Sequence, residues 1–112
     1  MSRAIEIVEV SARDGLQNEK QIFSTEQKIA LINRMVAAGA KRIEVASFAR
    51  PDRVPQMADA EAVIAGLALP DDVITIGLVM NKKGALRALE TKVLELGAVC
   101  VASDSFAQRN QG

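Results

Sequence analysis

The chain alternates between short apolar runs and segments whose apolar residues recur every three or four positions. Nearly continuous apolar runs of this length are typical of strands that are covered on both faces. They predict four strands, at residues 5–10, 43–48, 73–80 and 99–102.

Helical spacing of apolar residues separates these runs and predicts three helices. Ser24, followed by Thr25, Glu26 and Gln27, has the sequence of a helix N-cap, and Ala38-Gly39-Ala40 supplies a stop. A second helix is expected over 59–65, ending near Pro70, with Pro55-Gln56-Met57 as a helix start. A third helix is expected over 83–96, closed by Gly97.

This order of elements predicts a parallel α/β fold. Strand starts recur at roughly 25–35 residues, the size of one βα unit. Both an open doubly wound sheet and a closed (β/α)₈ barrel are built from such units, and composition does not choose between them. The chain ends in the polar segment 108–112, directly after the fourth predicted strand. We therefore expect it to be part of a larger fold.

Composition limits the classes of partner. The 112 residues, 49% of them hydrophobic, suffice for one small domain with a core, and 14 basic and 14 acidic residues cancel. A neutral chain without Trp or Tyr does not suggest nucleic acid or an anionic membrane as partner. The single Cys100 is expected to pack in the core of a protein in a reducing compartment. The absence of a leader or a long apolar run predicts a soluble, cytoplasmic protein.

Polar residues gather at or near the carboxyl ends of the predicted strands, the edge where parallel α/β folds bind ligands. Glu44 lies inside a predicted strand, and burying an unpaired carboxylate there costs several kcal/mol. It therefore needs a partner, and Arg13 is the obvious candidate. The residues at these ends are Arg13, Asp14, Glu44, Ser47, Asn81, Ser103, Asp104 and Ser105.

Each of these residues also has a purely structural interpretation. Arg13 and Asp14 could form an ordinary loop ion pair, and Glu44 could belong to a structural salt bridge. Asn81 before Lys82 is more typical of a turn or helix cap than of a ligand, and Ser103 and Ser105 are typical loop hydroxyls. Only their joint placement favours a functional interpretation.

Together, Arg13 and Asp14 suit one kind of chemistry. An aspartate is a hard oxygen ligand for Mg²⁺ or Mn²⁺, and a neighbouring arginine can stabilise an oxyanion or enolate. The pair would therefore suit carbon–carbon bond chemistry on a carbonyl substrate. One carboxylate is not a complete metal site, and the chain contains no histidine.

Four sequence blocks, in this order, resemble the 3-hydroxy-3-methylglutaryl-CoA lyase family of DRE-type, pyruvate carboxylase-like TIM-barrel metallolyases. The blocks are R-D-G-L-Q-N-E-K at 13–20, R-I-E-V-A-S-F-A-R-P-D-R-V-P-Q-M-A-D at 42–59, N-K-K-G at 81–84 and S-D-S-F-A-Q-R-N at 103–110. The resemblance implies that residues 1–112 are the N-terminal part of one (β/α)₈ barrel, about three βα units plus the fourth strand.

The resemblance also implies a reaction and roles for particular residues. The family cleaves 3-hydroxy-3-methylglutaryl-CoA to acetoacetate and acetyl-CoA, a step of leucine degradation, with a divalent cation. By position, Asp14 matches the metal-ligating aspartate and Arg13 the arginine that stabilises the departing enolate. Glu44 matches a catalytic glutamate that supports the site. The substrate-binding matches are Gln17, Ser47 and, for CoA, Asn110.

Three departures from the family leave alternatives open. The family's H-x-H metal ligands and catalytic cysteine loop lie downstream and have no counterpart in this chain. Ala12 stands where relatives usually have proline, a minor change in loop stiffness. Met80 stands before Asn81 where proline is common, and residues 103–112 differ from the best-known lyases, so a related, longer branched 3-hydroxyglutaryl-CoA is possible as substrate.

A half barrel would also leave its first and fourth strands unpaired. The complete enzyme is expected to be a dimer. The chain alone should associate, misfold or need the missing half, so a non-catalytic CoA-binding or self-assembling module is the second hypothesis.

Overall fold

A computed structural model describes residues 5–99, and the chain forms four strands and three α-helices within that range. Two short helical segments, π-helical η1 and 3₁₀-helical η2, lie between them. The elements are β1 (Val8–Glu9), η1 (Ser11–Gly15), α1 (Thr25–Ala37), β2 (Arg42–Ser47), η2 (Pro55–Met57), α2 (Ala60–Gly66), β3 (Ile74–Val79), α3 (Lys82–Leu89) and β4 (Glu95–Ala98).

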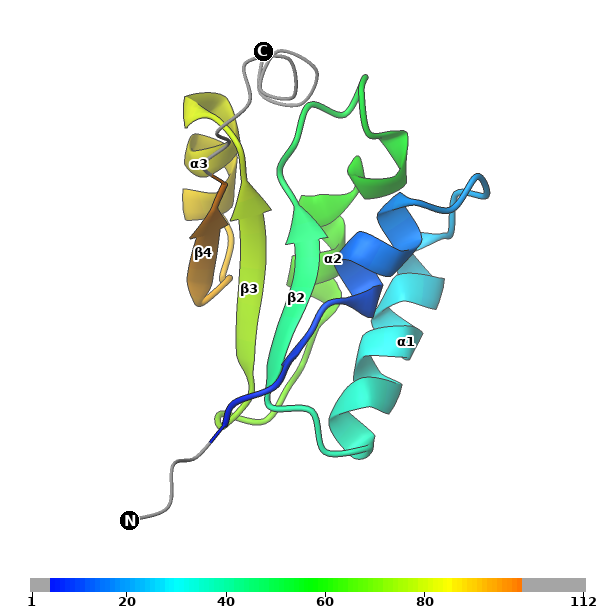
Figure 1. The fold of residues 1–112 in the computed structure, drawn as a ribbon, viewed down its shortest axis with the longest axis vertical. Helices are drawn as coiled ribbons and strands as arrows, with labels where there is room; N and C mark the ends of the chain where they lie inside the picture. Colours follow the sequence, from blue (N-terminus) through cyan, green and yellow to red (C-terminus); the bar gives the residue numbers. More distant parts are fainter. Residues whose placement is uncertain (1–4, 100–112) are drawn as a thin grey trace.

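The strands form one parallel sheet in the order β1-β2-β3-β4. In Figure 1, α1 lies beside the sheet, while α2 and α3 lie behind it. The predicted parallel α/β fold is confirmed. Between Glu44 and Ala46, the register of β2 against β3 shifts, so that Glu44 pairs with Ile76 and Ser47 with Leu78. This shift is a β-bulge in the strand that carries the predicted glutamate.

The core lies between the sheet and its helices. Ile32 from α1, Ile64 from α2 and Ile43 from β2 are each at most 1% exposed and belong to one apolar cluster. Phe48, directly after β2, is equally buried. A Cβ on Gly77 of β3 would lie 2.7 Å from Cε2 of Phe48, so only glycine lets this ring lie against the strand.

The predicted boundaries of α1 are confirmed. The Ser24 hydroxyl accepts from the Gln27 amide at 3.1 Å, and the Gln27 side chain accepts from the Ser24 amide at 2.8 Å, which makes a capping box. After α1, Gly39 has a φ of 107°, a left-handed conformation that glycine adopts without strain.

The prediction of a helix over 83–96 was wrong beyond Leu89. The Thr91 hydroxyl donates to the Ala88 carbonyl at 2.7 Å, which satisfies a carbonyl at the helix end. The chain then forms β4, which pairs with β3. Gly97 does not close a helix but lies in β4, opposite Leu78 of β3. The fourth strand therefore begins at Glu95, before the predicted range 99–102, of which residues 100–102 lie outside the described residues.

The first strand is shorter than predicted. Only Val8 and Glu9 of residues 5–10 pair with β2, and Ile5 and Ile7 are 89% and 79% exposed. Within residues 5–99, β1 has a neighbouring strand on one side only. The absence of a second neighbour explains why only part of the apolar run 5–10 forms strand.

Candidate active site

The predicted pairing of Arg13 with Glu44 is confirmed. Segment η1 turns the chain after β1, and the Val10 carbonyl accepts from the amides of Arg13 and Asp14 at 3.1 and 2.7 Å. This turn carries the Arg13 side chain to β2, where its Nε donates to the Glu44 carboxylate. The side chains of Arg13 and Glu44 are only 16% and 12% exposed. Each charge therefore compensates the desolvation of the other.

The same guanidinium contacts two more of the predicted site residues. Nη1 of Arg13 lies 3.5 Å from Oδ1 of Asp14 and 3.4 Å from Oε1 of Gln17. These are long contacts, so the hydrogen bond to Glu44 is the one that fixes the arginine. The structure thus brings Arg13, Asp14, Gln17 and Glu44 together beyond the end of β1.

The Asp14 carboxylate differs from Glu44 in its exposure. Its side chain is 56% exposed, and Asn18 donates to its backbone carbonyl at 2.8 Å and to Oδ1 at 3.4 Å. Asn18 was not identified from the sequence as a neighbour of Asp14. Its position four residues after Asp14 is the spacing at which side chains meet across one helical turn. Asp14 therefore has oxygen atoms that solvent or a ligand can reach.

The other predicted site residues have partners of their own or lie outside the described residues. Ser47 is fully buried, and its Oγ accepts from the Ala49 amide at 3.2 Å. Asn81 caps α3 by accepting from the Gly84 amide at 2.8 Å, as its structural interpretation predicted. Asn110, Cys100, Ser103, Asp104 and Ser105 lie outside the described residues.

The structure also contains a buried lysine that sequence reasoning missed. Lys28 of α1 is 3% exposed, and its Nζ donates to the Gln56 carbonyl and to Oδ1 of Asp59. The Thr25 hydroxyl donates to Oδ2 of Asp59 at 2.6 Å. The Gln56 side chain donates to the Glu19 carbonyl at 2.9 Å. We call Lys28, Thr25, Gln56 and Asp59 the lysine clamp.

The lysine clamp joins three segments around the site: the end of the Arg13 loop, α1, and the segment between β2 and α2. The sequence does carry a signal for this cluster. Lys28 lies one helical turn before Ile32, so it is on the same face of α1 as the helix's other buried residue. The P-Q-M-A-D end of the second sequence block is therefore used to hold the chain together.

The described residues do not make a metal site by themselves. No group of three or more His, Cys, Asp or Glu side chains within residues 5–99 is placed to hold an ion. Asp14 fits a hard cation as one accessible oxygen ligand, but Mg²⁺ and Mn²⁺ need several. Further ligands would have to come from other residues.

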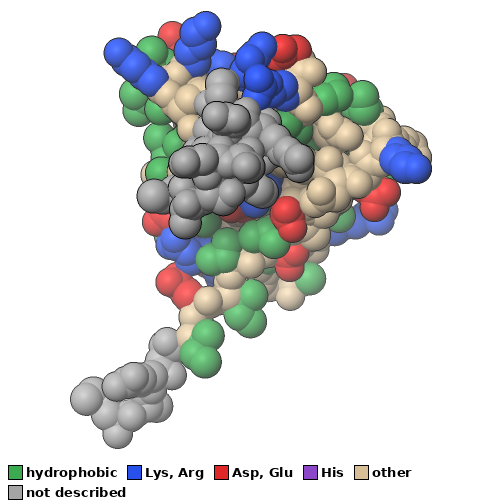
Figure 2. Space-filling model, turned by 45° about the horizontal axis from the view of Figure 1, so that its top comes forward, with side chains coloured by type: hydrophobic (Ala, Val, Ile, Leu, Met, Phe, Trp, Pro, Cys, Tyr) green, Lys and Arg blue, Asp and Glu red, His purple; other side chains and the backbone are tan. Residues whose placement is uncertain are grey.

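Charges of opposite sign lie close to one another on the surface in Figure 2. Glu61 accepts from Arg87 at 2.7 and 2.8 Å, and this pairing lowers the pKa of the Glu61 carboxyl. Lys41 donates to Asp72 at 2.7 Å and lowers the pKa of that carboxyl in the same way. The described residues include no helix long and apolar enough to cross a bilayer.

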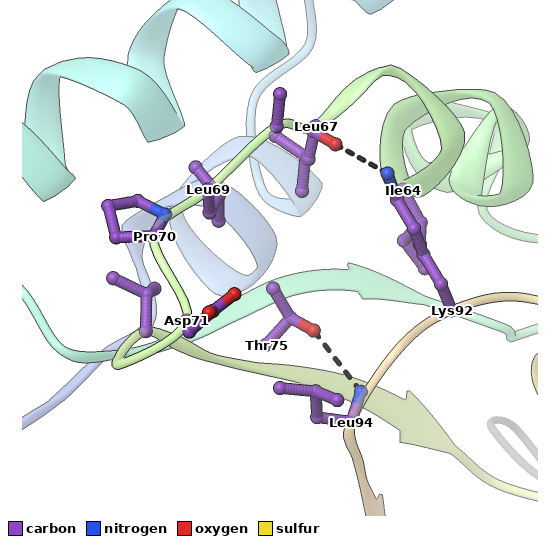
Figure 3. A pocket seen from close by; sticks show the side chains of 10 residues that line it. Ile64, Leu67, Leu69, Pro70, Asp71, Thr75, Lys92 and Leu94 are labelled. Carbon is purple, nitrogen blue, oxygen red and sulfur yellow. Dashed lines mark hydrogen bonds between the residues drawn. The ribbon is translucent and has the colours of Figure 1, made fainter.

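A pocket of about 370 Å³ lies away from Arg13, at the amino end of β3 (Figure 3). Most of the residues that line it are apolar, with Leu67, Leu69 and Leu94 among them. Two polar groups of its lining already have partners: Nζ of Lys92 donates to the Leu67 carbonyl, and the Thr75 hydroxyl accepts from the Leu94 amide. This pocket is not the predicted site.

Comparison with known proteins gives one consistent result. Residues 4–112 match the HMGL-like family. The chain is 44% identical over 110 residues to the 3-hydroxy-3-isohexenylglutaryl-CoA/hydroxy-methylglutaryl-CoA lyase of Pseudomonas aeruginosa, which covers 98% of this chain and 37% of that protein. The crystal structure of the HMG-CoA lyase from Brucella melitensis superimposes with a TM-score of 0.88 at 45% identity, covering 96% of this chain and 38% of that one.

A third similar structure contains ligands. It is an HMG-CoA lyase from Acinetobacter baumannii in complex with coenzyme A and 3-methylmalate, with a TM-score of 0.86 and 44% identity. It covers 89% of this chain and 33% of that one. The chain thus spans about a third of the length of these relatives, which are TIM-barrel lyases. With its match over 4–112, its parallel βα units and the agreement with these structures, the chain belongs to the HMGL-like family.

Proposed function

We propose that this chain provides the Arg13–Glu44 corner of an acyl-CoA lyase that cleaves 3-hydroxy-3-methylglutaryl-CoA to acetoacetate and acetyl-CoA. The observation that carries the proposal is the partly buried Arg13–Glu44 pair, with Asp14 and Gln17 beside it, beyond a strand end in a chain of the HMGL-like family. Residues 1–112 would form the N-terminal part of a single (β/α)₈ barrel.

The reaction needs a positively charged group beside the oxygen atom on which negative charge develops. The 3-hydroxyl group loses its proton, the carbon–carbon bond breaks, and a ketone forms as the electron pair moves to the enolate of acetyl-CoA. That enolate then takes up a proton at carbon. A guanidinium that is already oriented stabilises the enolate oxygen without reorganising during the reaction.

Glu44 is the residue that orients this guanidinium. It accepts from Nε of Arg13, which leaves Nη1 directed toward Asp14 and Gln17. We assign to Arg13 the stabilisation of the enolate oxygen. Glu44 would hold Arg13 in its orientation and balance its positive charge. Gln17 and Ser47 would contact the substrate, and Asn110 the CoA portion.

Asp14 would supply one oxygen ligand to a divalent cation, Mg²⁺ or Mn²⁺. Bound there, the cation would polarise substrate oxygens. The remaining ligands would come from outside residues 5–99, because this range provides no group of three ligating side chains. The expected dimer of the complete enzyme and its cytoplasmic location also remain predictions.

A longer branched substrate is the second candidate. It is favoured by the name of the Pseudomonas aeruginosa relative, which includes 3-hydroxy-3-isohexenylglutaryl-CoA. The choice between a methyl and an isohexenyl group would be made by residues around the substrate's third carbon, so both thioesters belong in the assay.

A chimera tests the proposal directly. Residues 1–112 replace the matching third of the Pseudomonas aeruginosa lyase, and release of acetyl-CoA is measured with each thioester. We expect activity that Arg13→Gln lowers by at least about 10²-fold in kcat, because removal of one oxyanion donor costs about 10²–10³. Arg50→Gln is the matched control, since Arg50 is 47% exposed and pairs with Asp52 on the surface.

Two results would contradict the proposal. One is a folded chimera without activity on either thioester. The other is an equal loss of activity in the Arg13→Gln and Arg50→Gln variants, which would mean that Arg13 has no special role. The 112-residue chain assayed alone shows whether the corner works without the rest of the barrel, and CoA binding without turnover would favour the non-catalytic hypothesis.

A further inference from the structure

Segment 16–23, between η1 and α1, is held more firmly at its two ends than along its length. At its start, Ala12 of η1 is 1% exposed, and Arg13 is bonded to Glu44. At its end, α1 begins with a capping box. No residue of 16–23 is buried, and Ile22 is 57% exposed. Packing therefore restrains this segment only weakly.

One hydrogen bond ties the middle of this segment to the rest of the fold. The side-chain amide of Gln56 donates to the Glu19 carbonyl at 2.9 Å. Within the part of the chain that the structure describes, this is the one hydrogen bond that joins segment 16–23 to a residue beyond the adjoining η1 and α1. In Figure 1, the segment and the chain before α2 lie side by side near the start of α1. The restraint on the segment therefore depends on this bond.

Gln56 is itself held in place by the lysine clamp. It lies in η2, which begins at Pro55, and the next residue, Met57, is 2% exposed. Nζ of Lys28 donates to the backbone carbonyl of Gln56, and Lys28 is 3% exposed. Buried neighbours thus fix the backbone of Gln56, while its side chain reaches Glu19. A donor on a fixed backbone restrains its acceptor more than a mobile surface side chain does.

The tied carbonyl lies next to two residues that contact the candidate site. Gln17, two positions before Glu19, accepts from Nη1 of Arg13 at 3.4 Å. Asn18, one position before Glu19, donates to the Asp14 carbonyl and carboxylate at 2.8 and 3.4 Å. Consecutive Cα atoms are about 3.8 Å apart, so a shift of the backbone at Glu19 reaches both contacts.

We propose that Gln56 is a positioning residue of the candidate lyase site. Its bond to Glu19 keeps Gln17 in contact with Arg13. The inference rests on the function proposed above. Gln56 does not contact the substrate in this scheme, but holds segment 16–23 where Arg13 meets the enolate oxygen. Loss of the bond lowers the fraction of molecules in which these groups are oriented together.

Variants of the chimera described above test the inference. Gln56→Met removes the donor but leaves the backbone carbonyl that Lys28 binds, so the lysine clamp should persist. We expect kcat for acetyl-CoA release to fall about 3- to 10-fold, which corresponds to one net hydrogen bond. Gln56→Lys supplies a new donor on an unbranched side chain and should restore much of the loss. Gln21→Met, at an exposed glutamine of the same segment, is the matched control and should keep the wild-type kcat.

Limited proteolysis measures the restraint on the segment without substrate. A glutamate-specific protease cuts after Glu19, at the carbonyl that accepts from Gln56, and after Glu90, which is exposed at the end of α3. Gln56→Met should raise the initial rate of the cut after Glu19 about 3- to 10-fold and leave the cut after Glu90 unchanged. Gln56→Lys should lower the rate after Glu19 again. Mass spectrometry assigns each cut.

A double variant shows whether the effect passes through the site. If Gln56 acts through Gln17, Gln56→Met should lower kcat less in a Gln17→Ala background than in the wild-type background, because the contact it supports is already lost. Losses that simply multiply would mean that the two residues act independently.

Four results in an active chimera would overturn the inference. They are an unchanged kcat in Gln56→Met, the same loss in Gln21→Met, no recovery in Gln56→Lys, and losses that multiply with Gln17→Ala. In the proteolysis, an unchanged rate after Glu19, or an equal rise after Glu19 and Glu90, would also overturn it. A chimera that is inactive with Gln56 in place contradicts the proposed function instead, and the proteolysis then decides whether Gln56 restrains the segment.

Discussion

Replacing Lys28 with methionine should destabilise the chain strongly, because it leaves the carboxylate of Asp59 without its cation. Lys28 is 3% exposed and Asp59 is 26% exposed. Removing one partner of a fully buried ion pair costs about 3–5 kcal/mol, and the quarter exposure of Asp59 lets water recover part of this. Asp59 also keeps its bond from Thr25 at 2.6 Å. We expect a loss of about 2–3 kcal/mol in the free energy of unfolding.

Lys41→Met provides the matched control, since the same side-chain change is made at the surface. Lys41 and Asp72 are 58% and 63% exposed, so their pairing contributes about 0–1 kcal/mol. Urea unfolding followed by circular dichroism, at one protein concentration for all variants, measures both changes. The corresponding fall in melting temperature for Lys28→Met is about 10–20 °C for a chain of this size.

The unfolding data can refute this reasoning in a simple way. If Lys28→Met and Lys41→Met lose the same free energy, the lysine clamp does not hold the fold together. A second variant separates the charge from the packing: Asp59→Asn in the Lys28→Met background should recover part of the loss, because no carboxylate is then left without a cation. No recovery would mean that the lost bond to the Gln56 carbonyl dominates.

Two further predictions concern packing and pH. Gly77→Ala should cost about 1–3 kcal/mol by overpacking, because its Cβ would lie 2.7 Å from the Phe48 ring, whereas Gly97→Ala meets neighbours only at 3.8 and 3.9 Å and should unfold like the wild type. Thermal unfolding of the two variants decides this, and equal melting temperatures would contradict it. Since Arg87 lowers the pKa of Glu61, the stability from this pair is present above the ordinary carboxyl pKa of about 4.3 and is lost as the pH falls through the lowered value. Glu61→Gln should therefore reduce the fall in stability between about pH 5 and pH 3, and an unchanged acid profile would show that the pair does not contribute.

The chain's sequence predicts those features that depend on local signals. Buried apolar runs located β2 and β3, and Ser24 with Gln27 located the start of α1. The pairing of Arg13 with Glu44 followed from the cost of a buried carboxylate, which holds in any fold that puts Glu44 inside a sheet.

Features that depend on distant partners could not be predicted in this way. The residues after Leu89 continue a helical pattern, yet they leave the helix because β3 offers a strand to pair with. The lysine clamp joins residues 31 positions apart, so only the assembled fold reveals why a lysine is buried. The length of β1 depends on what lies at its other side, which no pattern within residues 5–10 encodes.

The bulge in β2 has a consequence for how candidate site residues are recognised in strands. Glu44 and Ser47 are three residues apart, an odd spacing that in a regular strand directs two side chains to opposite faces. Because the register shifts between Glu44 and Ala46, they pair with Ile76 and Leu78, which are two residues apart and share a face. A carboxylate and a hydroxyl thus come to the same side through one extra residue. A strand with the same amino acids but without the bulge would direct the two side chains to opposite faces. A search for strand residues that share a face would also overlook this pair if it considered only even spacings.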